Sequence, residues 1–97
     1  MTAITPGHKY SLRNFQDGRE AQTIQFIEKD AAMNTINDGT TNEEVLAMLL
    51  NRLRFLNAKM PCRENSIAIT KMEEALLWLN ERTAERTRRG VEGTSAE

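Results

Sequence analysis

Two arginines, Arg82 and Arg86, have the residue type and spacing in this 97-residue chain that best suit ligand binding. They lie in the stretch LNERTAERTRRG, which follows a row of packing residues. At about 100° per residue, both arginines project onto the face that carries Ala68, Ala75 and Leu79, so they continue the packing face of the helix. They are one turn apart, roughly 6 Å between Cβ atoms. Two guanidinium groups at this spacing can close on one multiply charged anion.

The same arginines also have a purely structural interpretation. In this interpretation, the arginines pair with Glu81, Glu85 or acids of a neighbouring chain. Otherwise they cover the apolar end of a helix, where the helix dipole favours cations. Arg89 projects close to the same face and fits either interpretation. The residues alone leave both open.

An aromatic ring and an amide flank the predicted turn between two helices. Phe55 lies at the edge of the first helix's apolar arc, and Asn65 projects into that of the second. Together, a ring face and an amide can stack on and read a base or a ribose. Taken singly, Phe55 more often packs in a core and Asn65 more often caps a helix.

The length of the second helix decides how these residues can form a pocket. Asn65 and Arg82 lie about 25 Å apart along it at 1.5 Å per residue, which one small ligand does not bridge. In a two-fold pair of antiparallel hairpins, the turn of one chain can lie beside the arginine end of the other. We therefore expect Phe55, Asn65, Arg82 and Arg86 to form two equivalent composite pockets between chains.

The first predicted helix begins near Asn42, because Thr41 and Glu44 have the spacing of a capping box. It runs to about Lys59. Its apolar residues repeat at three-four spacing along one seam, namely Leu46, Leu49, Leu53, Leu56 and Met60. With the flanking apolar residues, the arc spans roughly 220°, which is more than one neighbour needs. We expect this helix to pack against partners on two sides.

A second helix is predicted from about Glu64 to Arg89, because Pro61 ends the first one and Gly90 stops the second. It has its own three-four row, formed by Ile69, Met72, Leu76 and Leu79. The short connection makes the two helices antiparallel.

The first forty residues are predicted to contain a small β-hairpin. MTAITPGHKY has the composition of an arm or loop. YSLRNF and QTIQFIEKD are predicted strands joined by a turn at QDGREA, with Leu12, Ile24 and Phe26 facing inward. The expected fold class is α+β, in one domain: a β region and linker over 1–40, a helical hairpin over 41–90 and a tail over 91–97.

Composition narrows the class of protein. Thirteen basic and fourteen acidic residues give a formal charge of −1, so the chain has no general attraction for nucleic acid or an anionic membrane. The single cysteine, Cys62, excludes an intrachain disulfide, and no apolar run approaches a membrane span. These two features make the cytosol the expected compartment. A chain this short buries little surface alone, so we also expect it to oligomerise.

Catalytic chemistry has little support in the sequence. His8 and Cys62 lie far apart, and neither belongs to a metal-binding or nucleophile motif. We expect Cys62 to be a small buried residue instead. No glycine-rich phosphate loop occurs. We therefore expect no catalytic residues, metal or cofactor.

The region from Ile36 to Thr94 resembles a known phage family, that of Thoeris anti-defence protein one, which shares a helical hairpin with the second anti-CBASS protein. The resemblance is carried by GTTNEEVL, PCRENSIAITK and RGVEGT, and TIQFIEKD fits the small sheet before the family's hairpin. The short amino-terminal region and Ser95 depart from the family pattern.

The resemblance implies a sponge that binds immune second messengers in the host bacterial cytoplasm without degrading them. Its implied ligands are glycocyclic ADP-ribose isomers made by TIR-domain enzymes, with cyclic trinucleotides at separate sites, and its implied assembly runs from dimers to hexamers. The family's ligand-binding positions fall on Phe55, Asn65, Arg82 and Arg86. Polar contacts to a trinucleotide are assigned by hypothesis to Arg54, Arg63 and Thr70.

The sequence leaves three other functions open. A structural or protein-binding hairpin would dock an acidic partner at its basic helix end. An enzyme that hydrolyses the signal would need a general base or metal site. Nucleic-acid binding would use the arginine end, although the near-neutral chain argues against it.

Overall fold

The computed structural model describes residues 1–88. They belong to two compact units, Met1–Thr41 and a helical unit that begins at Asn42. An antiparallel sheet precedes two helices, so the predicted α+β class is confirmed. The predictions for Arg89, Gly90 and the tail at 91–97 lie outside the described residues.

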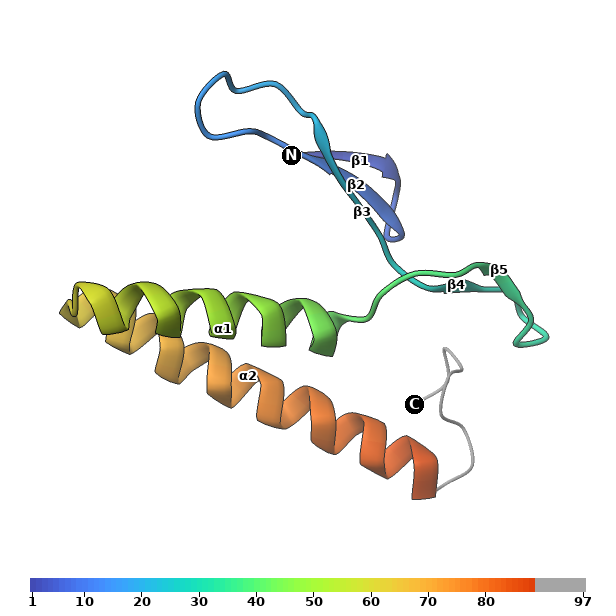
Figure 1. Cartoon of the computed structure of the whole chain (residues 1–97). Helices are drawn as coiled ribbons and strands as arrows, with labels where there is room; N and C mark the ends of the chain where they lie inside the picture. Colours follow the sequence, from blue (N-terminus) through green and yellow to red (C-terminus); the bar gives the residue numbers. More distant parts are fainter. Residues whose placement is uncertain (89–97) are drawn as a thin grey trace. The chain divides into compact units, whose positions relative to one another are not determined.

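The first unit contains a three-stranded antiparallel sheet of β1 (Thr2–Thr5), β2 (Lys9–Leu12) and β3 (Gln22–Gln25), with β2 in the centre (Figure 1). The predicted pairing of the second and third of these strands is confirmed, with Tyr10 opposite Ile24. The prediction of an irregular arm over residues 1–10 is wrong.

Pro6 and Gly7 explain that error, since they form a tight turn inside a hairpin. Gly7 has a φ of 83°, a backbone conformation that glycine adopts without steric cost. The amide of His8 donates a hydrogen bond to the carbonyl oxygen of Thr5 at 2.9 Å. The same two residues that favour a loop therefore reverse the chain between paired strands.

Of the three residues predicted to face inward, two do so. Ile24 and Phe26 are half-buried, and the Phe26 ring packs edge-on against Tyr10, with centroids 5.9 Å apart. Leu12 is 39% exposed, so its predicted inward position is wrong. It pairs with Gln22 at the last rung of the sheet, where the strands separate and little is left to cover it.

A second, two-stranded ladder follows, made of β4 (Glu28–Lys29) and β5 (Thr35–Asn37). After β5, the backbone at Gly39 packs closely against the end of β3. A Cβ atom at Gly39 would lie 2.4 Å from the carbonyl oxygen of Gln25, and the amide of Thr40 donates to that same oxygen at 2.9 Å. A glycine is therefore required for this close backbone approach.

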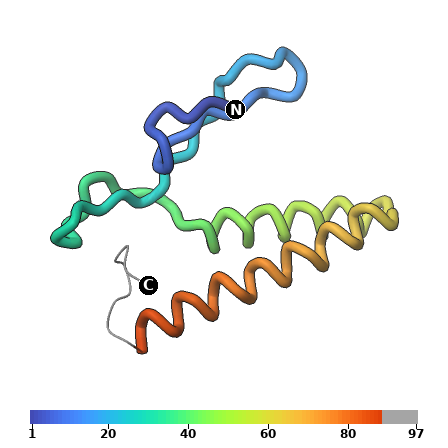
Figure 2. The backbone as a smooth tube through the Cα atoms, turned by 180° about the vertical axis from the view of Figure 1, so that it is seen from behind, coloured from blue at the N-terminus to red at the C-terminus, as the bar shows by residue number. Residues whose placement is uncertain are grey.

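The second unit is a helical hairpin of α1 (Asn42–Lys59) and α2 (Arg63–Arg88). The predicted start of the first helix at Asn42 is confirmed, and the second begins one residue before the predicted Glu64. Figures 1 and 2 show the helices running antiparallel from a short turn and diverging toward the opposite end. None of the described helices is long and apolar enough to cross a membrane.

The hairpin has a thin core within one chain. Among residues 1–88, Leu50 is the one hydrophobic residue that is fully buried, at 2% exposure. Eight large apolar side chains of the two helices and their connection remain exposed, namely Met48, Leu49, Phe55, Leu56, Met60, Ile67, Leu77 and Trp78. The two helices therefore leave these apolar side chains uncovered within one chain.

A buried hydroxyl and a carboxylate hold the first strand to the rest of the sheet. Glu20 accepts hydrogen bonds from the Ser11 hydroxyl at 2.7 Å and from the Thr2 hydroxyl at 3.0 Å. Its carboxylate also lies 3.3 Å from the amino group of Met1. The bonds from Thr2 and Ser11 lower the pKa of Glu20 from 4.5 to about 2.

We predict that Leu50→Ala destabilises the hairpin by about 2–5 kcal/mol, because it opens a cavity at the buried position. The control is Leu77→Ala, which removes a side chain that its own chain leaves 67% exposed and should cost much less. Urea denaturation followed by circular dichroism, at the lowest protein concentration that gives a signal, measures both. Equal losses in the two variants would show that Leu50 is not the centre of the core.

We predict that the Glu20 contribution to sheet stability is complete above pH 4.5 and is lost as the pH falls from 4.5 toward about 2. A carboxylate whose pKa is lower in the folded state stabilises that state only while it is charged. Acid unfolding of wild type and Glu20→Gln, monitored by amide resonances of β1 and β2, checks this. Identical pH dependence in the two proteins would contradict it.

Candidate ligand-binding site

The turn end of the hairpin presents an aromatic ring to the surface. Phe55, one turn before the end of α1, is 58% exposed, so the alternative that it packs in the core of its own chain is wrong. The ammonium nitrogen of Lys59 lies 4.5 Å from the centroid of the Phe55 ring. One face of the ring is therefore covered by a cation rather than by apolar side chains.

Asn65 lies in the first turn of α2 and is half-buried. The helix start is capped by a different residue: the backbone amide of Asn65 donates to Sγ of Cys62 at 3.4 Å. The amide of Cys62 in turn donates to Oδ1 of Asn57 at 3.0 Å. Since Cys62 supplies the cap, the side-chain amide of Asn65 is not needed for capping.

The arginine end continues the half-buried row of α2. Leu76, Leu79, Thr83 and Arg86 follow one another at three-four spacing, and all are half-buried. Arg82 is exposed, just off this row. The prediction that the arginines continue the packing face therefore holds for Arg86, while Arg82 stands at its edge.

Arg86 and its neighbour Arg88 differ in their ion pairs. Glu85 and Glu81 form ion pairs with Arg88 at 2.7 and 3.4 Å, and these hydrogen bonds, first that with Glu85, raise the pKa of Arg88. Arg86 forms no ion pair with a carboxylate among residues 1–88, and its Nε is buried without a hydrogen-bond partner. No acid within residues 1–88 therefore neutralises the guanidinium charge of Arg86.

Cross-helix contacts show which predicted residues one chain brings together. Arg54 pairs with Glu73 at 2.7 Å, and the Thr83 hydroxyl donates to Glu43 at 3.4 Å. The two helices therefore run antiparallel. Phe55 and Asn65 therefore share the turn end, and the arginines lie at the other end of the same hairpin. The shared pocket between two chains stays a prediction.

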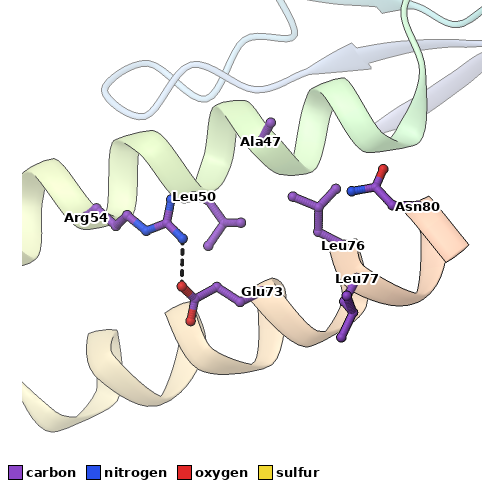
Figure 3. Close-up of a pocket in the computed structure, with 7 residues that line it drawn as sticks. All are labelled: Ala47, Leu50, Arg54, Glu73, Leu76, Leu77 and Asn80. Carbon is purple, nitrogen blue, oxygen red and sulfur yellow. Dashed lines mark hydrogen bonds and ion pairs between the residues drawn. The ribbon is translucent and has the colours of Figure 1, made fainter.

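A groove of about 300 Å³ lies between the two helices (Figure 3). It is lined by Ala47, Leu50, Arg54, Glu73, Leu76, Leu77 and Asn80. None of the four predicted ligand residues lines it. Figure 3 shows the Arg54–Glu73 ion pair on its wall, so this arginine already has a counter-charge.

Sequence reasoning missed the roles of three residues that shape these surroundings. The patterns mark Lys59 only as a helix end, predict burial for Cys62 and give Thr83 no role. Cys62 is exposed, so its predicted burial is wrong; its sulfur lies outside the core because it caps α2. The four-residue spacing of Phe55 and Lys59 is the one signal that could have paired them, since such residues are neighbours on a helix.

Within the described part of the chain, no cluster of three or more His, Cys, Asp or Glu side chains is placed to hold a metal ion.

Comparison with known families identifies the fold of this site. The profile described as Acb2/Tad1, hairpin domain, matches residues 20–84, about two thirds of the chain. The chain belongs to the Acb2/Tad1 hairpin family. The matched range contains Phe55, Asn65 and Arg82 and ends shortly before Arg86, so most of the candidate site lies inside the family domain.

A curated phage protein is also similar in sequence. The chain is 60% identical over 58 residues to the protein named Thoeris anti-defense 1 of Bacillus phage SBSphiJ7. The match covers 59% of this chain and 41% of that protein. The chain thus spans less than half the length of this relative within the match.

Proposed function

We propose that this chain is a phage anti-defence protein that binds and sequesters glycocyclic ADP-ribose isomers in the infected bacterium without degrading them. The observation that carries the proposal is Arg86, which ends the packing row and forms no ion pair with a carboxylate among residues 1–88. Membership of the Acb2/Tad1 family and the similarity to a protein named Thoeris anti-defense 1 support it.

The chemistry of the four residues suits such a nucleotide. The exposed Phe55 ring offers a stacking face for the base, and the Asn65 amide offers both a donor and an acceptor. Arg82 and Arg86, one turn apart, supply guanidinium groups for a diphosphate. Binding of this kind needs no general base, and the proposed protein stores its ligand instead of converting it.

Assembly is part of the proposal, because the two halves of the site lie at opposite ends of one hairpin. A two-fold dimer would place the turn end of one chain beside the arginine end of its partner and create two equal pockets. The exposed apolar residues of both helices supply the surface for this dimer and for its growth into a hexamer. Such an assembly would bury α1 on two sides, as its wide apolar arc predicts.

Cyclic trinucleotides are proposed as second ligands at a separate site. Of the three residues assigned to it by hypothesis, Arg54 pairs with Glu73, and the Thr70 hydroxyl donates to the carbonyl oxygen of Ser66 at 3.1 Å. A trinucleotide phosphate at Arg54 would therefore have to displace Glu73. Arg63 opens α2 beside the turn and is exposed.

A second candidate function is a protein-binding hairpin without a nucleotide ligand. Leu77 and Trp78, both 67% exposed on α2, favour it, because adjacent exposed apolar side chains of this size are typical of protein interfaces. The two candidates differ in what the purified protein binds on its own.

We predict that Arg82→Ala together with Arg86→Ala weakens binding of glycocyclic ADP-ribose by at least about a hundredfold, since two charge-assisted hydrogen bonds are lost. Arg88→Ala is the matched control: it removes a nearby arginine that is already paired with Glu85 and Glu81, and it should bind like wild type. Isothermal titration measures the affinities, with an expected stoichiometry of about one ligand per chain.

Ligand recovered after denaturing the saturated protein should be chemically unchanged on chromatography. A hydrolysed product would contradict sequestration, and a folded wild-type protein that releases no heat with any isomer would favour the protein-binding hairpin.

A further inference from the structure

The ammonium group of Lys59 covers one face of the Phe55 ring, on which the proposed ligand would stack. Its Nζ lies 4.5 Å from the centroid of the Phe55 ring. Lys59 is the last residue of α1, one turn beyond Phe55, and residues four apart on a helix are neighbours. The ring is more than half exposed, so this cation, and not a packed core, is what lies over it.

A covered ring face cannot stack on a base at the same time. An exposed cation–π contact is weak, and among residues 1–88 no carboxylate forms an ion pair with Lys59. A lysine side chain is a mobile point charge on a flexible stem. The ammonium can therefore leave the ring without breaking a second interaction.

We propose that Lys59 is an additional ligand-binding residue that exchanges the Phe55 ring for the ligand's phosphates when a base stacks on that ring. This inference rests on the proposed function, because it assigns a role within the same site. The side chain is anchored one turn from the ring, so the displaced ammonium stays within its own length of the stacked base. An anionic ligand supplies the new partner that the cation needs.

The exchange gives the site a chemical requirement for base and phosphate in one molecule. A nucleoside displaces the cation from the ring but offers it no anion in return. Pyrophosphate offers an anion but has no ring to stack on Phe55. A cyclic nucleotide with a diphosphate does both, so adenosine and inorganic pyrophosphate should each bind far more weakly than glycocyclic ADP-ribose.

The first test is isothermal titration of full-length variants with glycocyclic ADP-ribose at low and high salt. Lys59→Met keeps the apolar stem and should weaken binding about tenfold at low salt, since one charge-assisted contact is lost. The difference in affinity between Lys59→Met and wild type should become smaller at high salt, because salt screens exposed charges. Lys59→Arg keeps the charge and should therefore bind more tightly than Lys59→Met at low salt. Lys71→Met is the control: it removes an exposed lysine of α2 and should bind like wild type.

The second test follows the ring directly by NMR. The ε-methylene protons of Lys59 should be shifted upfield by the ring current in the free protein, and Phe55→Leu should abolish that shift. Saturation with ligand should return these protons to ordinary positions. The proposal is overturned if the shift persists in the saturated complex, or if Lys59→Met matches wild type at both salt concentrations.

These outcomes separate the inference from the function on which it rests. A wild-type protein that does not bind the nucleotide overturns both. Binding that is lost in the Arg82/Arg86 double variant, but is unchanged by Lys59→Met, overturns the role of Lys59 alone.

Discussion

Two helices packed side by side can bury only one stripe each, and this limit determines what the hairpin leaves exposed. In the hairpin the stripe contains one fully buried hydrophobic residue, Leu50, and the apolar arc of α1 extends well beyond it. The uncovered surface includes Leu49, Leu56 and Trp78, and the proposed dimer would cover it with a second chain. The same geometry keeps Phe55 and Asn65 apart from the arginines within one chain. The proposed assembly and the proposed ligand binding thus follow from the same geometry.

The helical half of the fold could be predicted from the sequence because its signals are local. A capping-box spacing, a proline in the turn and two three-four rows placed the helices to within about a residue at the ends that the structure describes. The sheet was predicted less well, since MTAITPGHKY carries no periodicity and its Pro6–Gly7 pair occurs both in arms and in tight hairpins. β1 is defined by its pairing with β2, which is a non-local property.

The candidate site was predicted as residue types, but its local electrostatics were not. Spacing alone does not show that Glu81 and Glu85 pair with Arg88, or that Cys62 caps the helix start near Asn65. These contacts depend on rotamers and on which acid reaches which base. They also remove two structural alternatives, an ion pair of Arg86 with these acids and a capping role for Asn65. The Lys59 ammonium over Phe55 changes how the proposed site would work. A base that stacks on that face of the ring would first have to displace the ammonium.

In the proposed site, one pocket takes its aromatic and amide groups from one chain and its arginines from another. Mixing two inactive variants tests this most directly: Phe55→Ala with Asn65→Ala in one chain, and Arg82→Ala with Arg86→Ala in the other. After joint refolding at equal concentration, mixed dimers should each contain one intact pocket. Nucleotide binding should then return at wild-type affinity with about one quarter of the wild-type stoichiometry. No recovery of binding, from mixed oligomers verified by mass spectrometry, would contradict a pocket shared between chains.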